Sequence, residues 1–211
     1  MANNIGPRCR LCRSEGTKLL LKGDRCKSSK CPVTKKKGAP GRGPRSRMKK
    51  VSDYGVMLRE KQKVKRTYGM QENQFRIFFD RASRAKGITG ENLIQLLERR
   101  IDNVVYRLRF APSRKAARQL VSHGHIAVNG KTVTIPSYMV KEGDEIAVKE
   151  RSSKLNFIKE NLKEYTRAGV APWLELDPDA MKGKVKAIPR RNEVTDLADI
   201  KEQLIVELYS K

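Results

Sequence analysis

The sequence predicts an α+β protein with three parts: a mostly helical lobe built from both chain ends, an inserted module of helices with a small β-hairpin sheet, and a basic amino-terminal arm. Apolar residues recur at helical spacing over residues 52–109, and they alternate at strand spacing around Asn129-Gly130. All four cysteines lie in the first 31 residues. We therefore expect an arm with a metal knuckle at 1–51, the helical lobe at 52–97, the inserted module at 98–150, and a carboxyl-terminal segment at 151–211 that returns to the helical lobe.

The cysteines of the arm have the spacing of a metal knuckle. Two residues separate Cys9 from Cys12, and four separate Cys26 from Cys31. A two-residue gap lets both thiolates of a tight turn reach one ion, and the intervening loop brings back the second pair. Disulfides are the competing interpretation, but the opening MANNIGPRCRLCR has no apolar run of a secretory signal, so we expect a cytosolic protein in which disulfides are rare. The four thiolates predict one structural zinc ion, with an iron–sulfur cluster as the alternative.

Residues 35–50, KKKGAPGRGPRSRMKK, mix Gly and Pro with basic residues and contain no acidic residue. Such a segment cannot form a packed element by itself. We expect an arm that becomes ordered on RNA, and a solvated linker is the plainer alternative.

Three helices are predicted after the arm. Ser52 is placed to cap the first, which ends at Gly69. The second runs from Gln71 to Lys86 and the third from Glu91 to Arg109. Aromatic residues in the second helix have helical spacing, which favours packing in a core over stacking on bases.

The stretch at 107–130, RLRFAPSRKAARQLVSHGHIAVNG, predicts a basic helix that leads into a hairpin. Ser113 stands at the N-cap position, and Gly124 follows the last turn. Asn129-Gly130 is the dipeptide that best tolerates a type I′ turn, and a third strand is expected at Glu145 to Val148. A rigid array of guanidinium groups and amides beside a hairpin suits the phosphates of folded RNA, whereas an ordinary solvated basic face is the alternative.

The carboxyl-terminal segment predicts one more helix and three short strands. The helix spans Ser153 to Arg167, and strands are expected at Pro172 to Leu176 and at Lys184 to Ile188. The tail QLIVELYSK alternates in polarity and predicts a closing strand.

The charge balance indicates a polyanionic partner. Lys and Arg total 47 against 23 Asp and Glu, which gives a formal charge of +24. Nucleic acid is the most common partner of such a surface, and an acidic membrane surface is the competing one. No run approaches the roughly 18 apolar residues of a membrane span. We find no nucleotide-binding glycine loop, paired carboxylates or nucleophile with a base, so no catalytic residue is predicted.

Several strings resemble a known family. Residues 98–150 resemble the S-four RNA-binding domain, which is shared by a small-subunit ribosomal protein, some pseudouridine synthases and some tRNA synthetases. The strings IGPRCRLCRSEG, SDYGVMLREKQKVKRTYG, LERRIDNVVYRLRF and EQLIVELYS extend the resemblance over almost the whole chain, to the bacterial small-subunit ribosomal protein S-four family. The chain departs from many members at residues 40–45, PGRGPR, where Gln and His are absent. Its cysteines match the subset with a metal-bound amino terminus.

The resemblance implies a structural constituent of the cytoplasmic small ribosomal subunit. Its members bind the 5′ domain junction of small-subunit rRNA as primary binders, nucleate subunit assembly, line the path by which messenger RNA enters and contribute to translational accuracy. The implied partners are rRNA, messenger RNA and the neighbouring small-subunit ribosomal proteins three and five, with no membrane and no small-molecule substrate. The competing classes are an RNA-modifying enzyme that carries this module and a stand-alone regulator of messenger leaders.

The predicted rRNA contacts are basic and polar side chains of the arm and the module: Arg8, Arg10, Arg13, Arg107, Arg109, Arg114, Lys115, Arg118, Gln119, Ser122, His123, Asn129 and Lys131. By motif position, Arg47, Lys49 and Lys50 are the candidates for contacting messenger RNA where it enters. We expect arginines to matter more than lysines wherever a phosphate is held bidentately.

Overall fold

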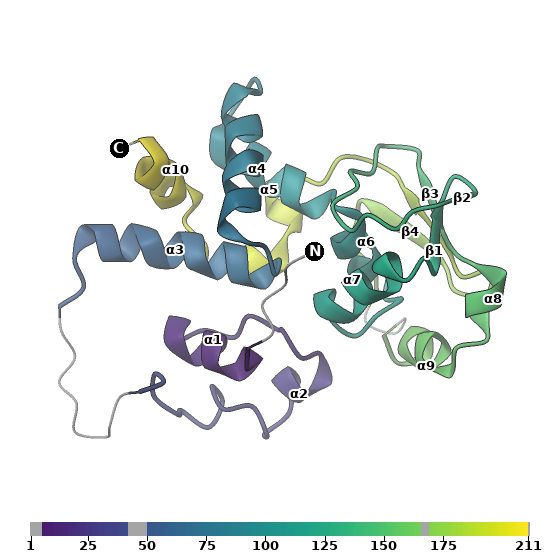
Figure 1. Cartoon of the computed structure of the whole chain (residues 1–211), viewed down its shortest axis with the longest axis horizontal. Coiled ribbons are helices and arrows are strands. Elements are labelled where there is room, and N and C mark those ends of the chain that lie inside the picture. The colour runs from purple at the N-terminus through teal and green to yellow at the C-terminus, as the bar shows by residue number, and fades with distance from the viewer. Residues whose placement is uncertain (1–5, 42–49, 166–168, 211) are drawn as a thin grey trace. The chain divides into compact units, whose positions relative to one another are not determined.

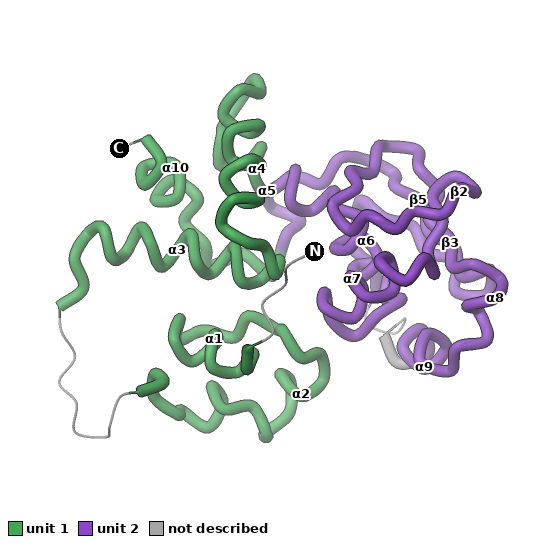
Figure 2. Tube along the Cα trace, in the orientation of Figure 1, with its two compact units in different colours: residues 1–93, 195–211 green, residues 94–194 purple. Residues whose placement is uncertain are grey.

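The structure is a computed structural model that describes residues 6–41, 50–165 and 169–210 (Figure 1). The chain forms two compact units, drawn in green and purple in Figure 2. Unit 1 comprises Met1–Leu93 with Thr195–Lys211, and unit 2 is Ile94–Val194. The predicted combination of helices with a small antiparallel sheet is confirmed.

Unit 1 is helical in its described part. Its elements are α1 (Arg8–Glu15), α2 (Asp24–Lys27), α3 (Asp53–Thr67), α4 (Glu72–Arg84), the start of α5 (Thr89–Glu98), the 3-10 helix η3 (Thr195–Leu197) and α10 (Glu202–Ser210). The cap of α3 is the expected one, because the Ser52 hydroxyl accepts a hydrogen bond from the Gly55 amide at 3.2 Å. The two helices predicted between Ser52 and Lys86 are confirmed as α3 and α4.

The carboxyl-terminal tail is a helix, and the predicted closing strand is wrong. α10 packs on α3, and the Tyr209 ring stacks on Phe79 with centroids 4.4 Å apart. The Tyr209 hydroxyl donates to Glu72 at 3.1 Å. Leu204, Val206 and Leu208 alternate as in a strand, whereas the apolar residues at 204, 205, 208 and 209 have helical spacing, so a short run of this kind does not distinguish the two states.

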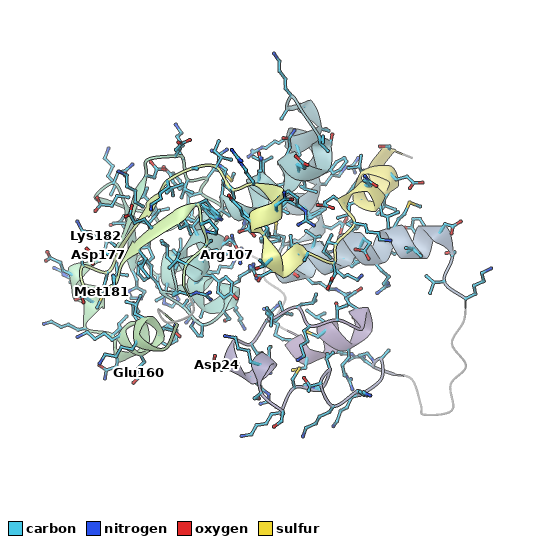
Figure 3. All side chains as sticks on the ribbon, turned by 180° about the vertical axis from the view of Figure 1, so that it is seen from behind. Asp24, Arg107, Glu160, Asp177, Met181 and Lys182 are labelled. Carbon is cyan, nitrogen blue, oxygen red and sulfur yellow. The ribbon has the colours of Figure 1, made fainter. Side chains whose placement is uncertain are left out.

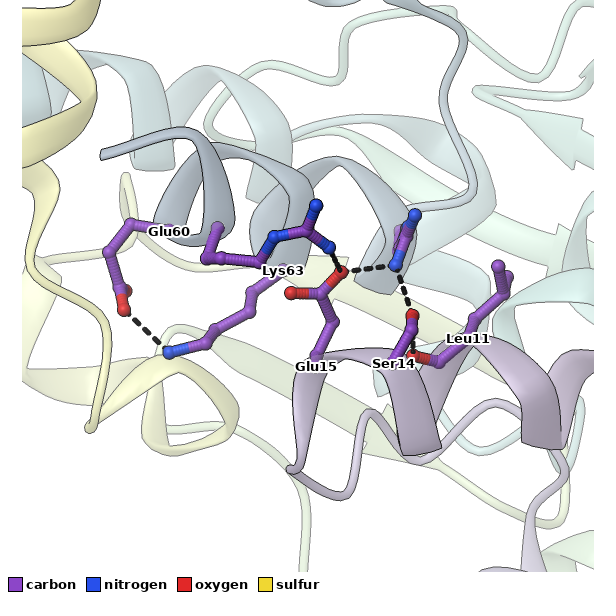
Figure 4. Close-up of polar contacts among 7 residues, drawn as sticks. Leu11, Ser14, Glu15, Glu60 and Lys63 are labelled. Atoms are coloured by element: carbon purple, nitrogen blue, oxygen red, sulfur yellow. Dashed lines mark hydrogen bonds and ion pairs between the residues drawn. The ribbon is translucent and has the colours of Figure 1, made fainter. Parts of the chain in front are cut away.

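Ion pairs join α1 to α3 (Figure 4). The Glu15 carboxylate accepts from Arg66 and, at 3.3 Å, from Arg59. Arg66 also donates to the Ser14 hydroxyl at 2.6 Å. Burial raises the pKa of Glu15, and the two arginines oppose that rise. The helix that carries the first cysteine pair is thus attached to the helical unit by charge.

Unit 2 contains a five-stranded antiparallel sheet in the order β2-β1-β3-β5-β4. The strands are β1 (Ile126–Val128), β2 (Lys131–Thr132), β3 (Glu145–Val148), β4 (Leu174–Asp177) and β5 (Lys182–Val185). The helices are the end of α5, α6 (Ile101–Arg107), α7 (Arg114–Ser122), α8 (Glu150–Ser153), α9 (Asn156–Tyr165) and the 3-10 helix η2 (Arg191–Glu193). The turn between β1 and β2 has φ of 49° at Asn129 and 76° at Gly130, so the predicted left-handed hairpin turn is confirmed.

The third predicted helix, Glu91 to Arg109, is interrupted and becomes α5 and α6. Arg100 has extended backbone angles and forms an isolated bridge with Met139, and the Ile101 amide donates to the Tyr138 carbonyl at 2.8 Å. A distant loop therefore takes the hydrogen bonds that a continuous helix would make internally. The helix predicted at Ser153 to Arg167 corresponds to α9, which begins three residues later at Asn156, and the short helix α8 that precedes it was not predicted. Residues 166 and 167 lie outside the described part of the chain.

Residues 151–194 belong to unit 2, which corrects the expected return of the whole 151–211 segment to the helical lobe. β5 pairs with β3 through Ile146 and Gly183, so it supplies hydrogen bonds to a strand that would otherwise be a sheet edge. Trp173 and Val185 are buried in the same core as Ile158. Only the chain from residue 195 onward rejoins unit 1.

Candidate RNA-binding surface

The basic helix α7 presents two different faces. The Ser113 hydroxyl accepts from the Ala116 amide at 3.3 Å, and Ala117 and Val121 are buried in the core of unit 2. The predicted cap is thereby confirmed. The side chains exposed on this helix and just after it are Lys115, Gln119, Ser122 and His123.

The hairpin adds an exposed ammonium group and a turn held by its own side chain. Lys131 is exposed at the start of β2. The Asn129 amide donates to Asp144 at 2.8 Å, and its oxygen accepts from the Glu145 amide at 2.9 Å. Asn129, a predicted RNA contact, thus also fixes the geometry of the hairpin.

A buried carboxylate holds one of the predicted RNA contacts. The Glu98 side chain is 0% exposed and accepts two hydrogen bonds from Arg107, at 2.9 and 3.0 Å. It also accepts from the Asn103 amide at 2.8 Å. Arg107 (labelled in Figure 3) therefore compensates a charge inside the module.

Arg114 is also directed into the module. Its residue is only 9% exposed, its Nε donates to the Asn103 oxygen at 2.8 Å, and its guanidinium lies 4.6 Å from the centre of the Tyr106 ring. Cation–π contact and a charge-assisted hydrogen bond both favour this placement. The exposed charge of α7 is accordingly that of its neighbour Lys115.

Asp102 gathers two further arginines. It accepts from the buried Arg100 at 2.7 and 3.1 Å and from Arg118 at 3.5 Å. Burial lowers the pKa of Arg118, and the Asp102 charge opposes that effect. Glu98 and Asn103 were not identified from the sequence as internal partners of the predicted RNA-binding arginines.

Arg109 occupies an unusual backbone position. Its φ is 65°, and its half-buried guanidinium donates to the Gly169 carbonyl at 3.4 Å. A left-handed conformation is costly for a side chain of this size, so the turn between α6 and α7 is held by its surroundings.

The arm arginines differ in accessibility. Arg10 is exposed, Arg13 is half-buried and Arg8 is buried, where burial lowers its pKa. Arg8 lines a groove of about 410 Å³ in unit 1 together with side chains of α3 and α4, among them Lys65. Arg10 is thus the most accessible of the three.

The predicted contacts to messenger RNA lie at the edge of the described chain. Lys50 is exposed immediately before α3. Arg47 and Lys49 lie outside the described residues.

The cysteines of the arm are free thiols, and Cys12, Cys26 and Cys31 are buried. Burial raises the pKa of Cys12 and of Cys26, while the Lys22 amide donates to the Cys26 sulfur at 3.3 Å and opposes the rise at Cys26. Across residues 6–41, 50–165 and 169–210, no three His, Cys, Asp or Glu side chains are arranged so that they could hold a metal ion. The metal site remains a prediction.

Comparisons with known proteins cover both units. Residues 3–98 match the Ribosomal protein S4/S9 N-terminal domain, and residues 99–146 match the S4 domain. The small ribosomal subunit protein uS4 of Geotalea daltonii is 57% identical over 211 residues, with the whole of both chains covered. The uS4 proteins of Thermoanaerobacter sp. (strain X514) and Desulfotalea psychrophila are 58% and 56% identical over the same full length.

The chain belongs to the uS4 family of small ribosomal subunit proteins. The predicted family resemblance is therefore confirmed. The family consists of ribosomal proteins and not of enzymes, so the expectations of a non-enzymatic protein with an RNA-binding domain, located at the cytoplasmic ribosome, are confirmed as well. Among the described helices, none is long and apolar enough to cross a membrane.

Proposed function

We propose that the exposed side of α7 and the adjoining hairpin bind small-subunit rRNA at the junction of its 5′ domain and nucleate subunit assembly. The supporting observation is that some polar side chains of α7 are exposed while others are bonded within the module. Lys115, Gln119 and Ser122 are exposed, while Arg114 and Arg118 are engaged inside the module. The helix that carries the exposed groups is therefore anchored to the core of unit 2.

Cations carried on an anchored helix suit an RNA junction, because folding of the junction brings phosphates close together. An ammonium group that neutralises a phosphate also releases a condensed counterion, which favours binding at low salt. Duplex RNA hides the base edges of its deep major groove, so recognition on α7 and the hairpin relies on shape, phosphates and 2′-hydroxyls.

A salt series tests this proposal. The full-length protein is titrated against the 5′ domain of small-subunit rRNA and against a structured control RNA of equal length. Preference for the rRNA that persists as salt rises is the expected result. Equal and steeply salt-dependent binding to both RNAs would leave non-specific charge as the only source of affinity and would overturn the proposal.

For the arm, we propose one structural zinc ion on Cys9, Cys12, Cys26 and Cys31. The supporting observations are that these thiols are free, that three are buried, and that a backbone amide donates to the Cys26 sulfur. Zinc would supply a crosslink to a short segment with little core of its own. The described arrangement of the thiols is not by itself a formed site, so the arm has to adjust when an ion binds.

Metal analysis tests the arm. One zinc per purified chain, with loss of arm helicity on chelation, is expected. Visible absorbance from an iron–sulfur cluster would favour the alternative cofactor, and a metal-free arm that is unchanged by chelator would contradict both.

We further propose that this protein contacts small-subunit proteins three and five and thereby contributes to translational accuracy. We also propose that Arg47, Lys49 and Lys50 contact messenger RNA where it enters the subunit. Lys50 is exposed next to the capped start of α3. Photo-crosslinking from position 50 in reconstituted subunits should label messenger RNA, and labelling of rRNA alone would contradict the assignment.

A further inference from the structure

A small cavity in unit 2 lies beside the exposed side of α7. Its volume is about 180 Å³, and it is lined by side chains of α7, of the turn between α7 and β1, and of α9: Ala116, Gln119, Leu120, His123, His125 and Phe157. It is smaller than the roughly 300–1,000 Å³ of a pocket for a drug-sized ligand. A single planar ring system is the kind of group that such a cavity accommodates.

Phe157 is exceptional among the phenylalanines of the chain. The sequence contains five, and Phe75, Phe78, Phe79 and Phe110 are all buried. Phe157 is 43% exposed at the wall of the cavity. Leaving an aromatic ring in water forgoes the free energy of its burial, so the position suits a ring that stacks on a ligand.

The other walls of the cavity combine an apolar surface with fixed polar groups. Leu120 is buried, whereas the Gln119 amide is exposed and offers both donors and an acceptor. The His125 Nδ1 lies 2.8 Å from the hydroxyl of the buried Ser152, which fixes the imidazole ring. Apolar faces with hydrogen-bonding groups at the edge are the complement of a nucleobase.

The charge beside the cavity favours a nucleic acid as the source of that base. Lys115 is exposed and lies four residues before Gln119 on α7, so the two side chains share one face of the helix. A phosphate held at Lys115 would bring the attached nucleotide within reach of the cavity.

We propose that this cavity receives one unpaired base of the bound RNA, stacked on Phe157 and hydrogen-bonded at its edge by Gln119. The inference rests on the proposed function and adds a base-reading element to a surface that otherwise contacts phosphates and sugars. Bases of RNA loops and bulges are readily displaced from their stack and held in this way.

The decisive variant is Phe157→Leu, which keeps an apolar side chain and removes the ring face. Affinity for the 5′ domain rRNA should fall about tenfold, the order expected for one stacked base. The dependence on salt should keep its slope, because no phosphate contact is lost. Phe157→Tyr keeps the ring face and should bind as the wild type does. Leu155→Ala, at an exposed position outside the cavity, should also bind as the wild type does.

A second experiment identifies the base. Abasic substitutions at the unpaired positions of the rRNA should include one that weakens wild-type binding about tenfold and has no additional effect on Phe157→Leu or Gln119→Ala. Circular dichroism and thermal melting check that each variant is folded.

The outcomes separate this inference from the proposed function. If the wild type shows no preference for the 5′ domain, the proposed function fails. If the preference is present but folded Phe157→Leu and Gln119→Ala both bind as the wild type does, or lose affinity only through a reduced salt slope, the cavity takes no base and the inference is overturned.

Discussion

Arg114 and Lys115 are neighbours in the sequence, yet their side chains have opposite environments. The Arg114 guanidinium is bonded to Asn103 and covers Tyr106, whereas Lys115 is exposed. The sequence shows both as cations on a basic helix. The partner that decides the difference lies eleven residues earlier in the chain, so local spacing could not reveal it.

Arg107→Ala should therefore act on stability more than on RNA binding. Removing this guanidinium takes two hydrogen bonds from the buried Glu98 carboxylate and should cost about 3 kcal/mol. The measurement is urea unfolding followed by Trp173, the single tryptophan, which is buried in unit 2.

Lys115→Ala is the matched control, because its side chain is exposed and its loss should leave the unfolding midpoint unchanged. An Arg107→Ala protein as stable as the wild type, but with a reduced salt slope, would show that Arg107 serves RNA and not the module.

The environment of Glu72 makes the stability of unit 1 depend on pH. Burial by itself would raise the pKa of Glu72, but hydrogen bonds from Lys61 and Lys65 lower it to about 2. The folded state then binds the proton less readily than the unfolded state, whose carboxyl has a pKa near 4.5. This contribution to stability is present above the unfolded pKa and is lost as the pH falls toward about 2.

Glu72→Gln should remove that contribution. The wild type should melt at a higher temperature than the variant at neutral pH, and the difference should shrink on acidification as far as about pH 2. Far-UV circular dichroism of both proteins across this range is the measurement. Parallel melting curves at every pH would show that the lysine contacts do not stabilise the fold.

At the scale of helices and strands, features determined by nearby residues were predicted correctly, and features determined by distant contacts were not. The cap at Ser113 and the turn at Asn129-Gly130 were predicted correctly because residue types within a few positions determine them. The break at Arg100 was missed because hydrogen bonds from the loop near Tyr138 create it. The tail was assigned to a strand because its packing on α3 is not visible in its own residues.

The strand predicted at Lys184 to Ile188 overlaps β5 only at Lys184 and Val185, and the sequence does not predict that β5 is a neighbour of β3. Gly183 explains why the strand can lie there, since a Cβ atom at this position would stand 2.4 Å from a methyl carbon of Leu108. No periodicity of the strand records this close approach.

Gly183→Ala should consequently destabilise unit 2 by about 1–3 kcal/mol through overpacking against Leu108. Lys184→Ala, at an exposed position of the same strand, is the control and should have little effect. Unfolding followed by Trp173 compares the two, and equal midpoints would place the constraint elsewhere.

At the scale of the whole molecule, the formal charge of +24 indicated a polyanionic partner but could not say which cations meet it. The family was apparent from long strings of sequence. The sequence did not reveal which cations are exposed, because several basic residues of the module are internal partners of Glu98, Asp102 and Asn103.

The most direct test of the account compares salt slopes for binding to the 5′ domain rRNA. We expect a Lys115→Ala, Lys131→Ala double variant to lose about two units of slope, roughly one for each phosphate contact, and to unfold as the wild type does. Arg107→Ala, measured in buffer without urea and in conditions where the variant remains folded, should keep the wild-type slope. An unchanged slope in the double variant, with a reduced slope in Arg107→Ala, would contradict the central claim that the exposed lysines, and not the internal arginines, meet the phosphates.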